Sequence, residues 1–398
     1  MPNLTAKKVL ALSAIALIAI NLRTAVSSLS PVVNFIQAEI SLPIVAIGLL
    51  GIAAPLAFAF ASSLSTKPAR KFGVELTLLI TVAAIITGNL IRALAFDTAS
   101  LFAGSMLTLF GVGIGNVLLP VMVRRYFPNR IGLVSSLYIT LTSISATMGS
   151  LFAVPVAEAA GWRFSLGQWA IFASLALIPL LPLLRNNQPS DDSTKTAKLK
   201  VWKSPTAISI AAVQSMTAIF GYVSFAWLPL LLIEHNGVSQ LAAGNLLALF
   251  AIMGLPTSLV VPVLAARFPA AQSMIVFFSA AVGSIGALGL LLSPDNLWLS
   301  VVLLGLGPTM FPLALTLFNL RSRNQQTVLA VSSFGQGVSY SLATAAVLLV
   351  GILREITGGW EAAIWLMFIV ALTSSLAGIQ LAKRRYVDDE LAANLNSH

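Results

Sequence analysis

Long apolar runs separated by short polar or basic segments make up this chain from end to end. Each run is about 20 residues or more, the length at which an α-helix crosses the hydrocarbon core of a bilayer. Peptide groups find no water there, so spanning segments form helices or closed barrels, and runs without period-2 alternation favour helices. The pattern predicts an all-α membrane protein with twelve transmembrane helices at 9–38, 42–64, 74–96, 99–123, 131–157, 164–184, 205–233, 240–264, 271–292, 296–320, 326–353 and 361–382.

Charge refines this prediction to a topology. Of 398 residues 58% are hydrophobic and 9% charged, and the formal charge is +10. Such a charge would suit nucleic acid, but the lysines and arginines lie in short clusters between apolar runs. With cytoplasmic termini, all but four of the 23 basic residues fall on the cytoplasmic side; the four are Arg23, Arg92, Arg163 and Arg354. The positive-inside rule therefore predicts that both termini are cytoplasmic.

The chain is predicted to be a tandem repeat. A polar stretch, 185–204, separates a six-helix half at 1–184 from a second at 205–382, followed by a cytoplasmic tail at 383–398. Gly113-x-Gly-x4-Pro120 recurs 192 positions later at 305–312, and Gly161-Trp162 recurs 198 positions later as Gly359-Trp360. Because six spans return the chain to its starting side, both halves have the same orientation, as in transporters with parallel repeats.

Several short motifs are distributed over the two halves. They are Asn21-Leu22-Arg23 with Ser27-Ser28-Leu29-Ser30-Pro31, Gly111-Val112-Gly113-Ile114-Gly115-Asn116, Arg124-Arg125-Tyr126-Phe127, Trp227-Leu228-Pro229 and Gln336-Gly337. The chain resembles the major facilitator superfamily over nearly its whole length, and these motifs resemble its cyanate permease and nitroimidazole transporter family. The resemblance implies transport by alternating access.

The segment 67–73 resembles a degenerate form of the superfamily's gate motif. Arg70, Lys71 and Gly73 fit that motif, but its aspartate is missing. The resemblance therefore does not extend to the charge latch that this aspartate usually forms. Glu75 is the candidate to replace it.

Arg23 is the first candidate binding residue. An arginine inside a membrane span costs about 2.5–3.5 kcal/mol on an insertion scale, so it normally faces a cavity, a partner or a substrate. At 100° per residue, Arg23, Ser27 and Ser30 share one narrow helix face. A structural role, in which Arg23 binds carbonyls near Pro31 or the side chain of Asn116, is the alternative.

Polar residues at helical spacing also occur on the fifth and eleventh spans. Tyr138 and Thr142 lie on the fifth, and Gln336 on the eleventh. These positions favour a polar cavity, although serines and threonines that bond to their own helix give the same pattern. Asn116, in the fourth span, is a further candidate.

The second half offers aromatic side chains where the first offers a cation. With Glu39 matched to Glu234, Ser27 corresponds to Tyr222 and Ser30 to Phe225. Rings would stack on a planar solute, while ordinary packing is the competing interpretation. The predicted substrate-binding set is Arg23, Ser27, Ser30, Asn116, Tyr138, Thr142, Tyr222, Phe225 and Gln336.

Acidic residues are expected only at or beyond the ends of the spans, and neither histidine falls within one. A proton-coupled pump usually has a titratable group in its pathway. We therefore expect a secondary or facilitative carrier of a small anionic or electron-rich solute, with a proton-driven multidrug or nitroimidazole exporter as the alternative. Arg92, one turn from the outer end of the third span, is expected to extend toward the interface.

The remaining expectations concern chemistry and partners. The chain has no cysteine, which excludes disulfides and thiolate-bound metals. No paired acids or Ser/His set can be assembled at membrane depth, so we expect no enzyme, no metal and no cofactor. The expected partners are a small-molecule substrate and the bilayer of a bacterial-type plasma membrane, with no nucleic acid and a monomeric chain.

Overall fold

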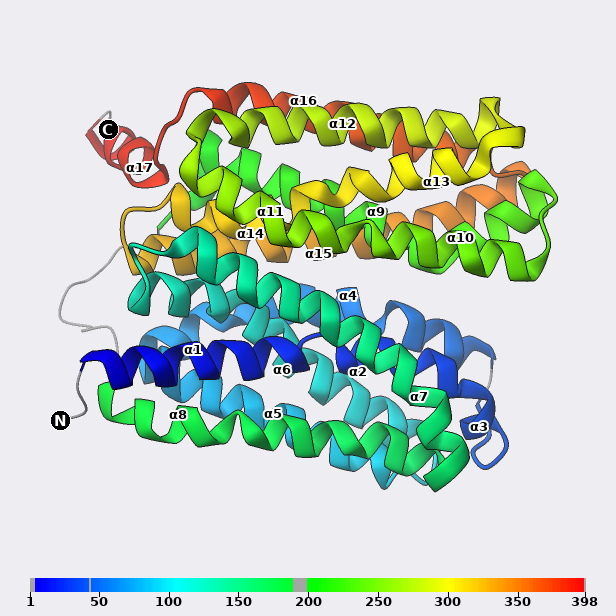
Figure 1. Ribbon diagram of the computed structural model, residues 1–398, viewed down its shortest axis with the longest axis horizontal. Coiled ribbons are helices and arrows are strands. Elements are labelled where there is room, and N and C mark those ends of the chain that lie inside the picture. The colour runs from blue at the N-terminus through cyan, green and yellow to red at the C-terminus, as the bar shows by residue number, and fades with distance from the viewer. Residues whose placement is uncertain (1–3, 43, 189–198, 397–398) are drawn as a thin grey trace. The chain divides into compact units, whose positions relative to one another are not determined.

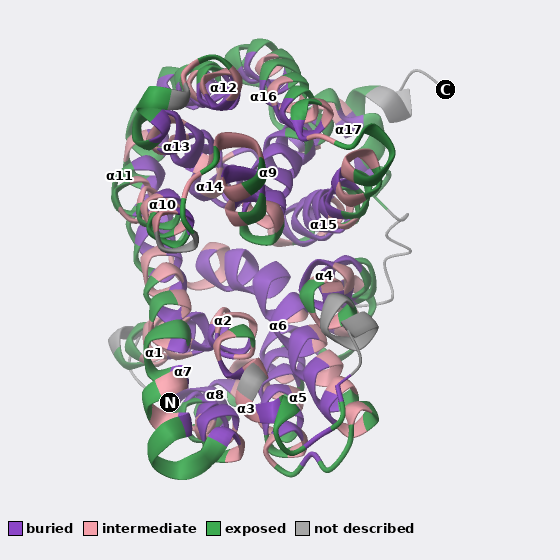
Figure 2. Cartoon of the chain, turned by 90° about the vertical axis from the view of Figure 1, so that its right-hand side faces the viewer, coloured by how far each residue is buried: buried purple, intermediate pink, exposed green. Residues whose placement is uncertain are grey.

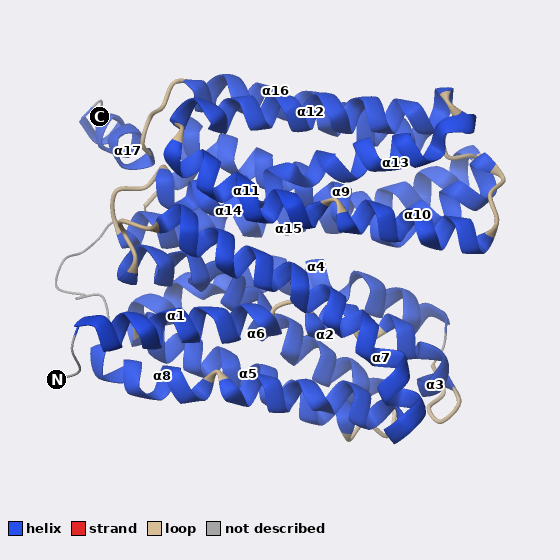
Figure 3. Ribbon diagram, viewed as in Figure 1, coloured by secondary structure: helices blue, strands red, loops and turns tan. Residues whose placement is uncertain are grey.

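The computed structural model describes residues 4–42, 44–188 and 199–396, and this part of the chain contains helices and turns but no strand (Figure 3). Eleven apolar helical stretches are long enough to cross a membrane. One of them, Ile131–Asn186, holds two spans, because Gly161 has φ +81° and ends one helix where the next begins. The prediction of an all-α fold with twelve membrane-length helices is confirmed.

The chain divides into two compact units. The first contains residues up to Lys198 together with Val328–Ser333, and the second contains Leu199–Thr327 and the residues from Phe334 onward. Most of the expected linker, 189–198, lies outside the described residues.

The first unit begins with a broken helix. The expected helix over 9–38 is wrong in detail, because turns interrupt it at residues 22–23 and 28–29. The elements of this unit (Figure 1) are α1 (Leu4–Asn21), α2 (Thr24–Ser27), η1 (Ser30–Val32), α3 (Val33–Gln37), α4 (Ile44–Phe72), α5 (Val74–Ala93), α6 (Thr98–Tyr126), α7 (Ile131–Leu175), α8 (Leu177–Leu183) and η2 (Leu184–Asn186).

The second unit has two spans that are interrupted at their middle. Met253 separates α10 from α11, and a 3-10 turn containing Pro308 separates α13 from α14, since proline cannot continue the helical ladder. Its elements are η3 (Val201–Lys203), α9 (Pro205–Asn236), α10 (Gln240–Ile252), α11 (Gly254–Arg267), α12 (Pro269–Leu292), η4 (Pro294–Asn296), α13 (Leu297–Leu306), η5 (Gly307–Thr309), α14 (Met310–Leu320), α15 (Gln325–Thr357), α16 (Glu361–Ala382) and α17 (Val387–Asn396).

Glycines let α6 run through the centre of the first unit, and Figure 2 shows this helix mostly in the colour of buried residues. A Cβ added to Gly104 would lie 2.8 Å from the backbone nitrogen of Arg92, on α5. A Cβ on Gly113 would lie 3.1 Å from the Cα of Phe58, on α4. Small residues allow backbones to approach this closely where apolar burial against lipid gives no driving force.

The repeat is visible in the burial pattern. When α5 is displaced by 198 positions onto α12, so that Val74 falls on Gln272, every buried residue of α5 falls on a buried residue of α12. The same displacement places Trp162 on Trp360, and both are buried. The two units therefore bury the same helical faces with different side chains.

The predicted tail 383–398 contains a short helix, α17, that is tied to the second unit. Glu390 accepts hydrogen bonds from the backbone and hydroxyl of Thr206 and from the hydroxyl of Ser204, at the start of α9. Asp388 accepts from Asn324 and Thr327 at the start of α15. The acids of α17 therefore satisfy donors at the N-termini of two longer helices, where negative charge is also favourable.

Candidate functional site

Arg23 lies at the break in the first span, inside the apolar stretch Ala6–Val32. It is not helical, with φ −123° and ψ −16°. Its backbone N–H donates to Ser145 Oγ, 3.2 Å away on α7, and the Ser145 hydroxyl donates to the Thr142 carbonyl at 2.9 Å. A side chain of α7 thus satisfies a peptide group that the break removes from the helical ladder.

Three polar residues lie on successive turns of α7 beside this break, and two of them, Tyr138 and Thr142, were expected from the sequence as binding residues. Tyr138, Thr142 and Ser145 are buried, and the Thr142 hydroxyl donates to the Tyr138 carbonyl at 2.8 Å. One turn further, Gly149 packs on Thr24, whose Cα would lie 3.0 Å from an added Cβ. The structure therefore brings Arg23 together with the polar face of α7 that contains Tyr138 and Thr142.

Ser27 and Ser30 differ in their hydrogen bonds and in their exposure. The Ser27 hydroxyl donates to the Arg23 carbonyl at 3.0 Å, while Ser30 is exposed in η1. The turn at 28–29 separates these two serines, so the continuous helix that would put them on one face is absent.

Two neighbours of Arg23 come from other helices. The Arg23 guanidinium carbon lies 5.8 Å from the ring centroid of Phe58, within cation–π range. Phe58 was missed by the sequence analysis, because an aromatic in an apolar run gives no periodic signal. Asn116 is buried on α6, and a Cβ on the adjacent Gly115 would lie 3.0 Å from Leu22 Cδ2. Asn116 therefore lies on the α6 segment that packs next to the break.

In the second unit, Tyr340 contacts Tyr222 and lies one helical turn from Gln336. The Tyr222 ring packs edge-on against Tyr340, with centroids 6.2 Å apart, and Gln336 is buried one turn before Tyr340 on α15. Phe225 is 57% exposed and packs edge-on against Phe250 of α10, with centroids 5.9 Å apart. Tyr340 was also missed by the sequence analysis, although it is one helical turn from Gln336.

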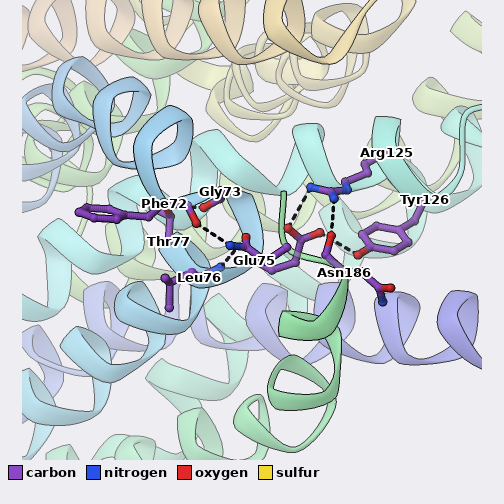
Figure 4. Close-up of polar contacts among 9 residues, drawn as sticks. Phe72, Gly73, Glu75, Leu76, Thr77, Arg125, Tyr126 and Asn186 are labelled. Carbon is purple, nitrogen blue, oxygen red and sulfur yellow. Dashed lines mark hydrogen bonds and ion pairs between the residues drawn. The ribbon is translucent and has the colours of Figure 1, made fainter. Parts of the chain in front are cut away.

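A charged cluster lies at the end of the first unit where α5 begins (Figure 4), here called its basic end. Glu75 is completely buried; it accepts from Arg125 at 2.9 Å and from the Tyr126 hydroxyl at 2.7 Å. Arg125 also donates to the Asn186 carbonyl at 2.6 Å. The candidate replacement for the missing aspartate thus pairs with an arginine of its own unit.

The opposite end of each unit has a glutamate, a tryptophan and an arginine. Glu39 pairs with Arg163, which lowers the pKa of Glu39, and Trp162 contributes in the same direction. In the second unit Glu234 pairs with Arg354 at 2.9 Å and accepts from the Trp360 indole at 2.9 Å. Arg163 and Arg354 do not occupy corresponding positions of the repeat, so each unit forms this combination with an arginine from a different helix.

Two repeated helical units, with polar side chains collected inside membrane-length bundles, define a multi-pass membrane transporter rather than an enzyme. The model of the Major Facilitator Superfamily matches residues 15–344. The chain belongs to this superfamily.

The chain is similar to several bacterial transporters over nearly its whole length. It is 33% identical over 382 residues to the uncharacterized transporter YycB of Bacillus subtilis, covering 94% of each chain. It is 31% identical to the 2-nitroimidazole transporter of Escherichia coli, covering 94% of this chain and 95% of that one. It is 28% identical to the cyanate transport protein CynX of the same organism, covering 86% and 90%.

Among solved structures, the proton:xylose symporter XylE has the same fold. The TM-score is 0.70, with 98% of each chain covered and 14% identity. This likeness concerns the fold alone. The family and the relatives confirm the resemblance seen in the sequence motifs.

Proposed function

We propose that the protein moves a small anionic or electron-rich solute, such as a cyanate-like anion or a nitroaromatic, across the plasma membrane by alternating access, with Arg23 as the central binding cation. The observation that carries this proposal is the position of Arg23 at a helix break within the first apolar stretch. Discontinuous helices are typical binding elements in transporters. A guanidinium supplies directed donors that suit planar, negatively polarised groups.

The relatives support the same solute class. Two of them are named for 2-nitroimidazole, a planar ring, and cyanate, a linear anion, and both solutes are rich in electron density. In the first unit the proposed binding residues beside Arg23 are Ser27, Ser30, Asn116, Tyr138 and Thr142. The second unit is proposed to contribute Tyr222 and Phe225 as stacking surfaces and Gln336 as an amide.

The test is ligand-induced thermal stabilisation of purified wild type and Arg23→Gln by cyanate, 2-nitroimidazole and a lipophilic cation. We expect wild type to be stabilised by one of the first two, and Arg23→Gln to lose at least about tenfold in affinity, as expected for removal of a charge-assisted contact of roughly 1.5–3 kcal/mol. Arg354→Gln is the matched control, since it removes an arginine that pairs with Glu234 at the opposite end of the second unit. Equal affinity in wild type and Arg23→Gln would contradict the proposal.

The second candidate function is a proton-driven exporter of multiple drugs or nitroimidazoles. The exposed aromatic Phe225 and the relative named for 2-nitroimidazole favour it. A pH-sensitive dye inside proteoliposomes distinguishes the two. We expect no solute-driven proton flux that depends on a residue within the spans; flux abolished by one substitution at membrane depth would establish the exporter instead.

A further inference from the structure

Arg92 is buried at the end of α5 opposite the basic end, and its expected extension toward the interface is wrong. Its side chain is 1% exposed. Within the described residues, Nη1 donates to Asn89 Oδ1 at 3.3 Å, whereas Nε and Nη2 have no hydrogen-bond partner and no carboxylate forms an ion pair with the guanidinium. A buried guanidinium in this state is strongly destabilising unless something compensates its charge.

The second unit shows that the fold itself needs no charge here. At the displacement of 198 positions that matches the buried faces of α5 and α12, Arg92 corresponds to Leu290 and Asn89 to Ala287. Both are buried, with Leu290 1% exposed. The same space in the repeat is thus filled by apolar side chains, so packing alone does not explain the arginine.

Two further donors lie at the level of Arg92 on the neighbouring helices. Gly104 of α6 packs on the Arg92 backbone nitrogen, and the next residue is Ser105. Ala95 after α5, Leu101 of α6 and Leu166 of α7 pack in one buried apolar cluster, and one turn further from this end of the unit the same three segments carry Arg92, Ser105 and Trp169. Ser105 Oγ and Trp169 Nε1 are buried and have no hydrogen-bond partner in the described parts of the chain.

The tryptophan is also specific to the first unit. Displaced by 198 positions, Trp169 corresponds to Met367, which is buried and has no N–H to donate. In the first unit, α5, α6 and α7 therefore each carry a donor. The second unit has apolar side chains, Leu290 and Met367, at the positions that correspond to Arg92 and Trp169. Donors of this kind without acceptors match an anion, which would supply both the missing acceptors and the counter-charge.

We propose that Arg92, Ser105 and Trp169 form a binding site for a small inorganic anion of halide size, separate from Arg23. Near-complete burial of all three side chains favours a monatomic ion over a larger solute. The anion would neutralise the guanidinium between α5, α6 and α7 and so stabilise this end of the first unit. The proposal does not depend on the identity of the transported solute.

The experiment is thermal unfolding of the purified full chain in detergent, with sodium gluconate replaced stepwise by sodium bromide at constant ionic strength. A ligand that binds only the folded state raises the melting temperature in a saturable way. We expect this rise in wild type and in Arg23→Gln, and its loss in Arg92→Leu, which installs the residue of the second unit. In crystals grown with bromide, we expect an anomalous peak between Arg92, Ser105 and Trp169.

Other outcomes overturn the site. A melting temperature in wild type that is independent of bromide contradicts it, and so does a bromide response that persists in Arg92→Leu. A response that disappears in Arg23→Gln alone assigns the anion to Arg23. If Arg92→Leu does not fold, Trp169→Phe keeps the ring and removes one donor; its half-saturating bromide concentration is expected to rise roughly fivefold to tenfold, and an unchanged value contradicts the proposal.

Discussion

Each unit has an arginine at the C-terminal end of its fourth span, and the two arginines are neutralised differently. Arg125 reaches the buried carboxylate of Glu75 and the carbonyl of Asn186. Arg321, just after α14, reaches the amide oxygen of Gln272 at 2.8 Å and the carbonyls of Leu381 and Arg385. Each arginine therefore connects the start of the third span of its unit to the end of the sixth. Arg125 does so with a carboxylate and a carbonyl, and Arg321 with an amide oxygen and two carbonyls.

The difference shows two ways of holding a guanidinium at a membrane boundary. In the first unit a full counter-charge is buried with it. In the second, neutral acceptors surround Arg321, and burial lowers the pKa of its guanidinium. The acids near Arg321 belong to α17 and bind Arg323 and the helix N-termini. The first connection therefore depends on a buried charge, and the second on a neutral amide and backbone carbonyls.

The largest expected effect breaks the first connection. Glu75→Ala leaves Arg125 and the Tyr126 hydroxyl without their acceptor, and we expect a loss of about 3 kcal/mol, since removing one partner of a buried pair strands the other. Gln272→Ala is the control and should cost only about 1–2 kcal/mol, because Arg321 keeps two carbonyls. The melting temperatures of the two variants in detergent test this order, and equal losses would show that charge makes no difference.

Exchanging the acceptor side chains of Glu75 and Gln272 should change the free energy of unfolding by a smaller amount, and in opposite directions at the two positions. Glu75→Gln keeps the shape of the acceptor but removes its charge, so we expect a loss of about 1–2 kcal/mol. Gln272→Glu gives Arg321 a counter-charge, and we expect a gain of up to about 1 kcal/mol. Thermal unfolding of both single variants and of the double variant measures this; a destabilised Gln272→Glu would show that the second unit cannot accommodate the buried charge.

The smallest effect concerns the exposed pair between Arg323 and Asp389, at 2.8 Å. Arg323 lowers the pKa of Asp389 in the folded state. This stabilisation is therefore present above the unfolded pKa of about 3.9 and is lost as the pH falls through the lower folded value. We expect Arg323→Gln to lower the melting temperature slightly at pH 7 and less at pH 3, whereas Arg384→Gln, which removes an exposed charge nearby, should show no such pH dependence.

The sequence predicted the fold well, because the length of the apolar runs and the basic clusters depend on the membrane itself. It placed Tyr138 and Thr142 on one face of α7, since helical periodicity holds there, and the binding role of these residues and of Arg23 stays a prediction. It failed where the helix breaks: periodicity assumed a continuous helix through Ser28 and Leu29, although Pro31, just beyond them, lacks the N–H that would continue the helical ladder. It also failed at Arg92, because three-helix packing, and not distance from the helix end, determines its burial.

The contacts of α17 have a consequence for the synthesis of the protein. Thr206 and Glu390 are separated by 184 positions. At about 5–20 residues per second, the ribosome makes Glu390 roughly 10–40 s after Thr206. During this interval the first turn of α9 has no Glu390 to accept its hydrogen bonds. The second unit therefore gains these contacts only after α17 is made, and nascent chains that stop before α17 would present the Thr206 donors without this acceptor to the quality-control machinery, with Ser204 alone capping α9.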